Sequence, residues 1–224
     1  MKKTLCLFPK DGTTEFLRPI YDELCKKDNI VGFDDDAIEN DDYFEILENH
    51  LQEIDSLIFL GHGSGTTLYG TNFNPIIDDK NDYIRYLKGC KLLLFSCKSI
   101  DYISNYGLND AIGFGFIPTS IDDTREGKLH GLDISCLESP DLQLFRDSII
   151  RIWLRTIKYA EWDAPYSFII NFSFFTDIEI VDVLTNHKDV THYRLVADML
   201  YYLKSDMKQV VFQKVCLERI HSSL

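Results

Sequence analysis

The sequence predicts an α/β protein with a mostly parallel central sheet that is flanked by helices and followed by a helical C-terminal part. Two short, unbroken apolar runs, at residues 57–60 and 92–95, each end abruptly in small polar residues. Such runs are typical of strands that are buried on both faces of a parallel sheet. Segments with helical spacing lie between these and other apolar runs, and this alternation of strands and helices is typical of a parallel sheet.

The elements of the first part can be assigned in order. The apolar run before Pro9 predicts the first strand, and residues 30–33 predict the second. Residues 14–27 and 41–54 carry apolar side chains at helical spacing, so each segment predicts a helix. Because Pro9 cuts the first apolar run short, we do not expect a secretory signal peptide.

The same alternation continues beyond the strand at residues 57–60. Residues 81–89 predict a short helix that ends at a glycine, and the second unbroken apolar run follows it. Residues 99–106 predict one or two helical turns. Residues 111–117 predict a further strand, which ends at Pro118.

A loop and a long helix are predicted next. Residues 121–135 are polar and contain glycine, so we expect a loop that could hold a short hairpin and could line a substrate groove. A long helix is predicted from Ser139 to about Trp162, with Ser139 as its cap and Pro140 at its first position.

The C-terminal part is predicted to pack on the preceding core. Residues 166–175 are aromatic and β-branched and predict a strand. Residues 177–186 and 191–211 predict helices. We therefore expect a core of residues 1–165, with the strand and helices of residues 166–224 packed on it, as parts of one domain.

A histidine follows one of the two buried runs, and a cysteine follows the other. In open α/β sheets, ligands bind outside the carboxyl ends of the strands, so we expect His62 and Cys97 to lie on the same rim. A free thiol has a pKa of roughly 8.5 and needs a nearby base to act as a nucleophile at neutral pH. We therefore expect a catalytic dyad with Cys97 as nucleophile and His62 as base. The alternative for Cys97 is a small apolar core residue.

Gly63 directly follows the histidine. A residue without Cβ lets the backbone approach a substrate closely. We expect the N–H groups of Gly63 and Cys97 to form an oxyanion hole, in which each donor contributes on the order of 3 kcal/mol. His130, near the predicted groove, is a reserve candidate for the base.

This arrangement resembles the caspase-like cysteine peptidases, which include caspases, metacaspases, separase and the bacterial CHAT proteases. The resemblance rests on an apolar strand before His62 and Gly63, a second apolar strand before Ser96 and Cys97, and a spacing of 35 positions between histidine and cysteine. The spacer, with residues 67–70 and a helical segment before the second strand, is also similar to that family. The resemblance covers about two thirds of the chain. It implies a caspase-like sandwich and a cysteine endopeptidase with a Cys-His dyad.

The resemblance also bears on substrate choice. Caspase-like enzymes that cut after Arg or Lys hold the basic side chain with carboxylates. Asp122 and Asp123 follow a predicted strand and are candidates for substrate binding, because a carboxylate would give an Arg side chain a charge-assisted contact. Phe95 stands where metacaspases have an aspartate, two positions before the cysteine. The alternative for Asp122 and Asp123 is a solvated loop.

A metal site is not expected. The acidic segment at residues 34–42 invites a calcium interpretation because some metacaspases require calcium, but it lacks the glycine and the twelfth-position glutamate of an EF-hand. We interpret it as a solvated loop before a helix. The six cysteines have no CxxC spacing, which favours reduced cytoplasmic thiols over a disulfide framework or a zinc site.

Composition limits the partners. The chain has 224 residues and a formal net charge of −13, which argues against binding nucleic acid or an anionic membrane surface. No segment approaches the ~20 apolar residues of a membrane span. We expect a cytoplasmic enzyme without a cofactor. The resemblance adds a protein substrate, an activating protein partner and a role as a bacterial antiphage or cell-death effector.

Two other function classes remain open. The chain could be a catalytically inactive caspase-like module that serves as an interaction partner, as the phenylalanine at position 95 and the helical tail would allow. It could also be a flavodoxin-like domain that binds a phosphate at the turn of residues 9–14, although this turn is only weakly suited to a phosphate.

Overall fold

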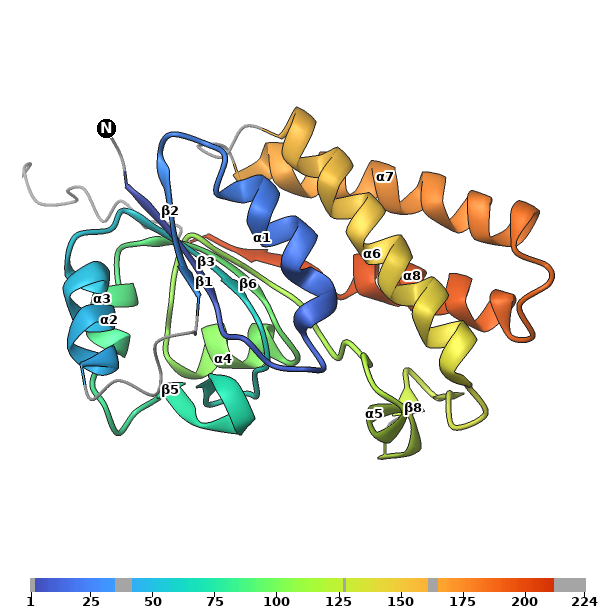
Figure 1. Ribbon diagram of the computed structural model, residues 1–224, viewed down its shortest axis with the longest axis horizontal. Coiled ribbons are helices and arrows are strands. Elements are labelled where there is room, and N and C mark those ends of the chain that lie inside the picture. The colour runs from blue at the N-terminus through green and yellow to red at the C-terminus, as the bar shows by residue number, and fades with distance from the viewer. Residues whose placement is uncertain (1–2, 35–41, 127, 161–164, 212–224) are drawn as a thin grey trace, which may run out of the picture.

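A six-stranded, mostly parallel sheet forms the centre of the molecule (Figure 1). The computed structural model describes residues 3–34, 42–126, 128–160 and 165–211. The strand order is β10-β7-β6-β3-β1-β2, and all neighbours are parallel except β10, which is antiparallel to β7. The strands are β1 (Thr4–Phe8), β2 (Ile30–Asp34), β3 (Ser56–Leu60), β6 (Lys91–Phe95), β7 (Ala111–Gly113) and β10 (Lys208–Val210).

Helices cover both faces of this sheet, which confirms the predicted α/β class. One face packs on α2 (Tyr43–Gln52), α3 (Ile84–Leu87) and α4 (Ser99–Asn105). The other packs on α1 (Arg18–Leu24), α6 (Ser139–Tyr159), α7 (Pro165–Asn186) and α8 (Tyr193–Ser205).

Side chains alternate between the two faces along each strand. In β3, Ile58 and Leu60 lie in the cluster under α1 and α6, whereas Leu57 and Phe59 lie in the cluster under α2 and α3. Successive side chains of a strand point to opposite faces, so a strand covered on both faces must be apolar throughout. This explains the unbroken apolar run.

The small elements lie mostly around the carboxyl ends of the parallel strands. A 3-10 turn, η1 (Glu15–Leu17), precedes α1. After β3 come β4 (Leu68–Tyr69), η2 (Thr71–Phe73) and β5 (Pro75–Ile77). After β7 come α5 (Ile121–Glu126) and the hairpin strands β8 (Lys128–Leu129) and β9 (Leu132–Asp133). The β8–β9 hairpin matches the short hairpin that the predicted loop of residues 121–135 could hold. The sequence did not indicate α5.

The predicted strand at residues 166–175 is wrong, because these residues belong to α7. Phe168, Phe172 and Phe175 point into the core at helical intervals of four and three residues. The apolar residues between them hide this period, and a short apolar run does not distinguish a strand from a helix.

The C-terminal segment joins the sheet as well as the helical layer. The predicted helix over residues 191–211 corresponds to α8 followed by β10, which was missed. β10 pairs with β7 from Lys208 opposite Gly113 to Val210 opposite Ala111. α7 and α8 contribute to the same apolar cluster as α1 and α6.

The long helix begins at Ser139, so its N-cap lies one residue earlier than predicted. Glu138 is the N-cap of α6 and forms a capping box with Asp141, while Pro140 lies in the first turn. The helix ends at Tyr159. Trp162, Cys216 and most of the acidic segment, at residues 35–41, lie outside the described residues.

Candidate functional site

The register of two neighbouring strands brings His62 and Cys97 together. Leu60 at the end of β3 is paired with Phe95 at the end of β6. His62 and Cys97 each follow two residues later, so the spacing of 35 positions in the sequence is the register offset of the two strands. Both residues line one small cavity at the carboxyl ends of the strands.

Gly63 allows the two strand-end loops to touch. A Cβ at this position would lie 2.5 Å from the Ser96 hydroxyl oxygen and 3.2 Å from the Cys97 carbonyl oxygen. No side chain fits there unless one of the loops moves. The buried Ser96 hydroxyl has no hydrogen-bond partner among the described residues, which is unusual for a buried polar group.

The two proposed oxyanion donors are unoccupied. Gly63 bridges to Leu68, but the ladder hydrogen bonds there are made by its neighbours, from Ser64 N–H to the Thr67 carbonyl and from Tyr69 N–H to the His62 carbonyl. Neither the Gly63 N–H nor the Cys97 N–H donates a hydrogen bond to another described residue. Both N–H groups thus lack an acceptor among the described residues, as the donors of an oxyanion hole would before substrate binds.

Asp11 and Thr13, which no sequence pattern indicated, hold the imidazole. Nε2 of His62 lies 2.6 Å from Oγ1 of Thr13 and 3.3 Å from Oδ1 of Asp11. The same Asp11 oxygen accepts hydrogen bonds from the Thr13 N–H at 2.9 Å and the Thr13 hydroxyl at 2.7 Å. Burial alone would raise the pKa of the Asp11 carboxyl, but its hydrogen bonds with Thr13 and His62 hold that pKa below its ordinary value.

This network fixes the tautomer of the neutral imidazole. The single hydroxyl proton of Thr13 is donated to Asp11, so Thr13 accepts a hydrogen bond from His62, whose proton is then on Nε2. The lone pair of Nδ1 is left free, and Nδ1 has no hydrogen bond to a described residue. A base with a free lone pair is what the thiol requires.

Phe73 covers the imidazole. Its ring stacks on that of His62 with 4.5 Å between centroids. Both Phe73 and the preceding Asn72 have positive φ, at 58° and 55°. Such a backbone is unfavourable for a bulky side chain, and strain of this kind is concentrated at functional sites.

The Cys97 thiol is hydrogen-bonded to the backbone of Ile117. Sγ lies 3.1 Å from the Ile117 carbonyl oxygen, to which it donates, and accepts a hydrogen bond from the Ile117 N–H at 3.4 Å. Burial raises the pKa of the thiol to about 11, and the charge of Asp123 adds to this, against smaller opposing effects of the Ile117 N–H and Lys98. The thiol is therefore protonated at neutral pH, and it makes no hydrogen bond with His62.

The cavity lined by the two side chains is small. Its volume is about 20 Å³, which leaves room for about one water molecule. Phe16 and Leu17 of η1 line it on one side, and Ile117 and Thr119 line it on the other. A cavity of this size does not hold a peptide side chain, so a peptide substrate would need more room beside Cys97.

Asp122 and Asp123 lie on α5 and do not line this cavity. The Asp123 carboxylate accepts hydrogen bonds from the N–H groups of Thr119 and Ser120, so it caps the helix. Asp122 is exposed and lies 3.5 Å from Arg125. Of the two, Asp122 has the carboxylate that a ligand could reach.

His130, the reserve candidate for the base, lies elsewhere. Its Nε2 lies 2.7 Å from the Asp206 carboxylate, and its ring stacks on Tyr202 of α8 with 4.3 Å between centroids. These contacts join the β8–β9 hairpin to the C-terminal helix and give His130 a structural role.

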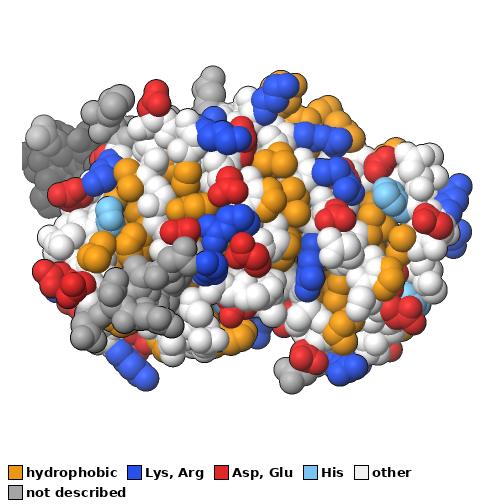
Figure 2. Space-filling model, viewed as in Figure 1, with side chains coloured by type: hydrophobic (Ala, Val, Ile, Leu, Met, Phe, Trp, Pro, Cys, Tyr) orange, Lys and Arg blue, Asp and Glu red, His pale blue; other side chains and the backbone are white. Residues whose placement is uncertain are grey.

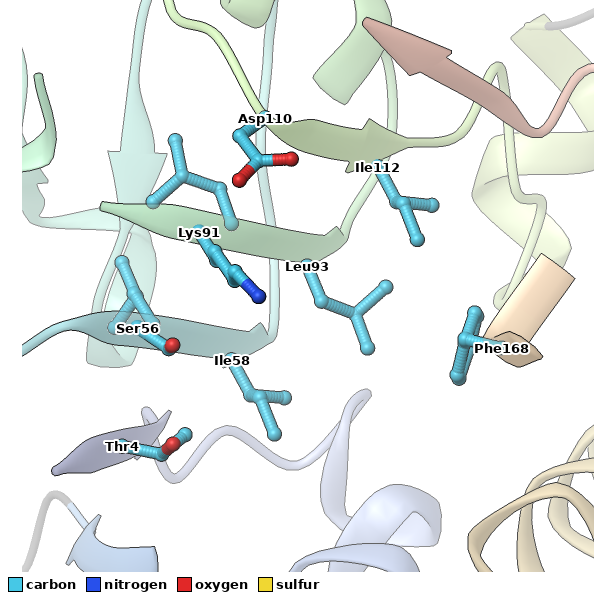
Figure 3. Close-up of a pocket in the computed structure, with 10 residues that line it drawn as sticks. Thr4, Ser56, Ile58, Lys91, Leu93, Asp110, Ile112 and Phe168 are labelled. Atoms are coloured by element: carbon cyan, nitrogen blue, oxygen red, sulfur yellow. The ribbon is translucent and has the colours of Figure 1, made fainter. Parts of the chain in front are cut away.

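A second cavity, of about 40 Å³, lies at the amino ends of the parallel strands, opposite the rim with His62 and Cys97 (Figure 3). Apolar side chains line it on the side of Phe168, and polar ones line it at the strand starts. Its labelled lining residues are Thr4, Ser56, Ile58, Lys91, Leu93, Asp110, Ile112 and Phe168. Open α/β sheets bind ligands at the carboxyl ends of their strands, so the rim with His62 and Cys97 is the stronger candidate site.

Comparison of the chain with models of known protein families, with curated proteins and with solved structures finds no match. Within the described part of the chain, no helix combines the length and apolar character needed to cross a membrane. The same residues include no group of three or more His, Cys, Asp or Glu side chains placed to hold a metal ion. The geometry around His62 and Cys97 is therefore the basis on which a function can be assigned.

Proposed function

We propose that this chain is a cysteine endopeptidase of the caspase-like type, with Cys97 as nucleophile and His62 as general base and acid. The observation that carries the proposal is the convergence of both side chains on one cavity, with the His62 ring held by Asp11 and Thr13. A nucleophile, a base and a group that orients the base are the parts that covalent acyl transfer requires.

The proposed reaction has the following course. Nδ1 of His62 takes the thiol proton, and the Cys97 thiolate attacks the peptide carbonyl carbon. The N–H groups of Gly63 and Cys97 stabilise the oxyanion. The imidazolium then gives its proton to the leaving amine, and water hydrolyses the acyl-enzyme with His62 as base. Asp11 stabilises the imidazolium in both steps.

The small volume of the cavity supports a regulated enzyme. The protonated thiol and the lack of a hydrogen bond between Cys97 and His62 describe a resting state. In our proposal, an activating protein partner separates η1 from the segment of residues 117–119, which admits a peptide. A role as an antiphage or cell-death effector would fit such control. Asp122 would contact a basic substrate side chain at the rim.

Cleavage of a proteome-derived peptide library tests the activity. We expect the wild-type protein to generate new peptide termini, and we expect Cys97→Ala and His62→Ala to generate none while they keep the thermal unfolding midpoint of the wild type within a few degrees. Asp189→Asn, a change at an exposed carboxyl in the turn between α7 and α8, is the matched control. New termini produced equally by Cys97→Ala would contradict the proposal.

A second candidate function is an inactive interaction module. The raised pKa of the Cys97 thiol favours it, because a thiol that stays protonated is a poor nucleophile. Complete absence of cleavage by the wild type, together with unchanged binding of a partner by Cys97→Ala, would support this module over the peptidase.

A further inference from the structure

Helix α7 carries an apolar stripe on the side that faces away from the core. We call these six residues the α7 outer stripe: Tyr166, Ile170, Phe174, Ile178, Val181 and Leu184. Each is between 40% and 69% exposed. Their intervals of four, four, four, three and three residues average the helical repeat, so they form one continuous line along the helix.

The stripe is not needed to hold α7 in place. The opposite side of the helix already supplies Phe168, Phe172, Phe175 and Val183 to the core, each 9% exposed or less. A surface helix usually carries polar side chains where it meets solvent. Six large apolar side chains there indicate a surface that a second molecule covers.

The apolar area is sufficient for a dimer interface. One exposed tyrosine flanks each side of the helix. Tyr159 at the end of α6 contacts Phe175 of α7. Tyr201 of α8 lies beside Lys204, which forms an ion pair with Asp177 of α7. Together with the stripe, these side chains expose roughly 600 to 900 Å², above the few hundred Å² found on monomers and close to the ~800 Å² that each partner buries in a standard interface.

Charges beside the stripe are already paired. Glu179 is bound by Arg151 and Arg155 of α6, and Asp177 is bound by Lys204 of α8. Figure 2 shows acidic and basic side chains interspersed over the visible face of α6, without a field of one sign. The carboxylates of α7 are therefore balanced by partners within the same copy, which lowers the repulsion between two copies although the chain as a whole has a net charge of −13.

The order of residues in the stripe is nearly self-complementary. If two copies of α7 pack antiparallel about a two-fold axis near residue 175, every large side chain meets a smaller or aliphatic one from the other copy. The pairs are Tyr166 with Leu184, Ile170 with Val181, and Phe174 with Ile178. A two-fold interface requires one patch to match itself in this way.

We propose that the α7 outer stripe is the interface of a two-fold symmetric dimer in which α7 of one copy packs antiparallel on α7 of a second copy. The dimer leaves the rim with His62 and Cys97 free, because that rim lies at the carboxyl ends of the strands and α7 lies at the outer side of the helical layer (Figure 1). The proposal is independent of the peptidase activity.

Sedimentation velocity of the full chain over a concentration series tests the dimer. We expect the wild type to sediment with twice the chain mass of 26.0 kDa at tens of micromolar, and we expect Phe174→Glu to sediment as a monomer. Phe44→Glu is the matched control, because Phe44 is 45% exposed on α2, on the other face of the sheet. A wild type that stays monomeric at these concentrations, or a Phe174→Glu variant that dimerises as well as the wild type, would overturn the proposal.

Cross-linking tests the register and does not depend on a disruptive variant. Copies with Tyr166→Cys are mixed with copies with Leu184→Cys and oxidised, and intact mass and peptide mapping locate the bond. We expect the mixed disulfide between positions 166 and 184 to exceed either bond between like positions several-fold. A preference for 166 with 166 would indicate a parallel arrangement and would contradict the antiparallel pairing.

Discussion

The imidazole Nε2 of His62 lies 2.6 Å from the hydroxyl oxygen of Thr13, and Thr13 in turn donates its hydroxyl proton to Asp11. The loop after β1 thus supplies an orienting pair for a histidine that follows β3. The pair keeps the proton of the neutral ring on Nε2 and leaves Nδ1 as the base. Two strands away from the nucleophile, a carboxylate therefore becomes part of the proposed catalytic apparatus.

This contact predicts that Asp11 and Thr13 act through His62. Asp11→Asn and Thr13→Val should lower kcat by about 10²- to 10⁴-fold with little change in KM, because the imidazole loses its fixed orientation and the imidazolium loses its charge partner. Steady-state kinetics on a peptide found in the library would measure both constants. A rise in KM with unchanged kcat would show that Asp11 and Thr13 bind substrate instead.

Asp11 should also make stability dependent on pH. The folded state lowers the pKa of its carboxyl, so the ionised group stabilises the protein above its ordinary pKa of about 4, and this contribution is lost as the pH falls through the folded value. Urea unfolding of wild type and Asp11→Asn between pH 7 and pH 3 should show a difference that shrinks as the pH falls. A difference that is constant over this range would exclude ionisation of Asp11 as its source.

Local patterns predicted most of the sheet and the position of His62 and Cys97 on one rim. The buried strands could be recognised because a strand that is covered on both faces is apolar throughout. Such a run is visible in the sequence even when the neighbouring strands are not known. The approach of His62 to Cys97 followed from the rule that parallel strands end on one rim. Asp11 could not be identified in the same way, because its contact with His62 spans 51 positions and leaves no spacing signal.

The errors arose where tertiary contacts decide the structure. The aromatic segment at the start of α7 was predicted as a strand because apolar side chains lie on its solvent side as well as its core side. β10 was missed because a three-residue strand at a sheet edge is defined by its pairing with β7, not by its own sequence. The α7 outer stripe, which obscured the helix in the sequence, is thus also the feature that indicates a dimer.

Gly63 should tolerate no side chain. Gly63→Ala places a methyl group against Ser96 and the Cys97 carbonyl, which should lower the free energy of unfolding by about 1–3 kcal/mol and separate the two strand ends. Gly12→Ala is the matched control, since a Cβ there meets nothing within 4 Å and should change stability by less than about 0.5 kcal/mol. Chemical denaturation of both variants measures the difference. Equal stability would mean that the loop after β3 adapts freely.

The charge of Asp123 should affect the pKa of the Cys97 thiol without a direct contact. Because its carboxylate raises the pKa of the Cys97 thiol, Asp123→Asn should lower that pKa while the amide oxygen still accepts the capping hydrogen bonds. Asp122→Asn, at the exposed neighbouring carboxyl, should leave the thiol pKa unchanged. The pH dependence of Cys97 alkylation, followed by peptide mass spectrometry, compares the two variants. An equal shift in both would assign the effect to the net charge of α5.

In a permanently active peptidase, the catalytic cysteine would react faster than the other thiols. Here we expect Cys25 to react faster than Cys97. Hydrogen bonds from Cys6 and Tyr21 lower the pKa of Cys25 to about 7 against the opposing effect of burial, whereas burial raises the pKa of Cys97 to about 11. Since the thiolate is the reactive form, iodoacetamide at pH 7.5 should modify Cys25 well before Cys97. In a Cys25→Ser background, Cys97 should react slowly, with a rate that climbs towards pH 11, and should react faster once a partner or substrate opens the cavity. Rapid modification of Cys97 at neutral pH in the isolated chain would contradict the resting state and would mean that the dyad is already assembled.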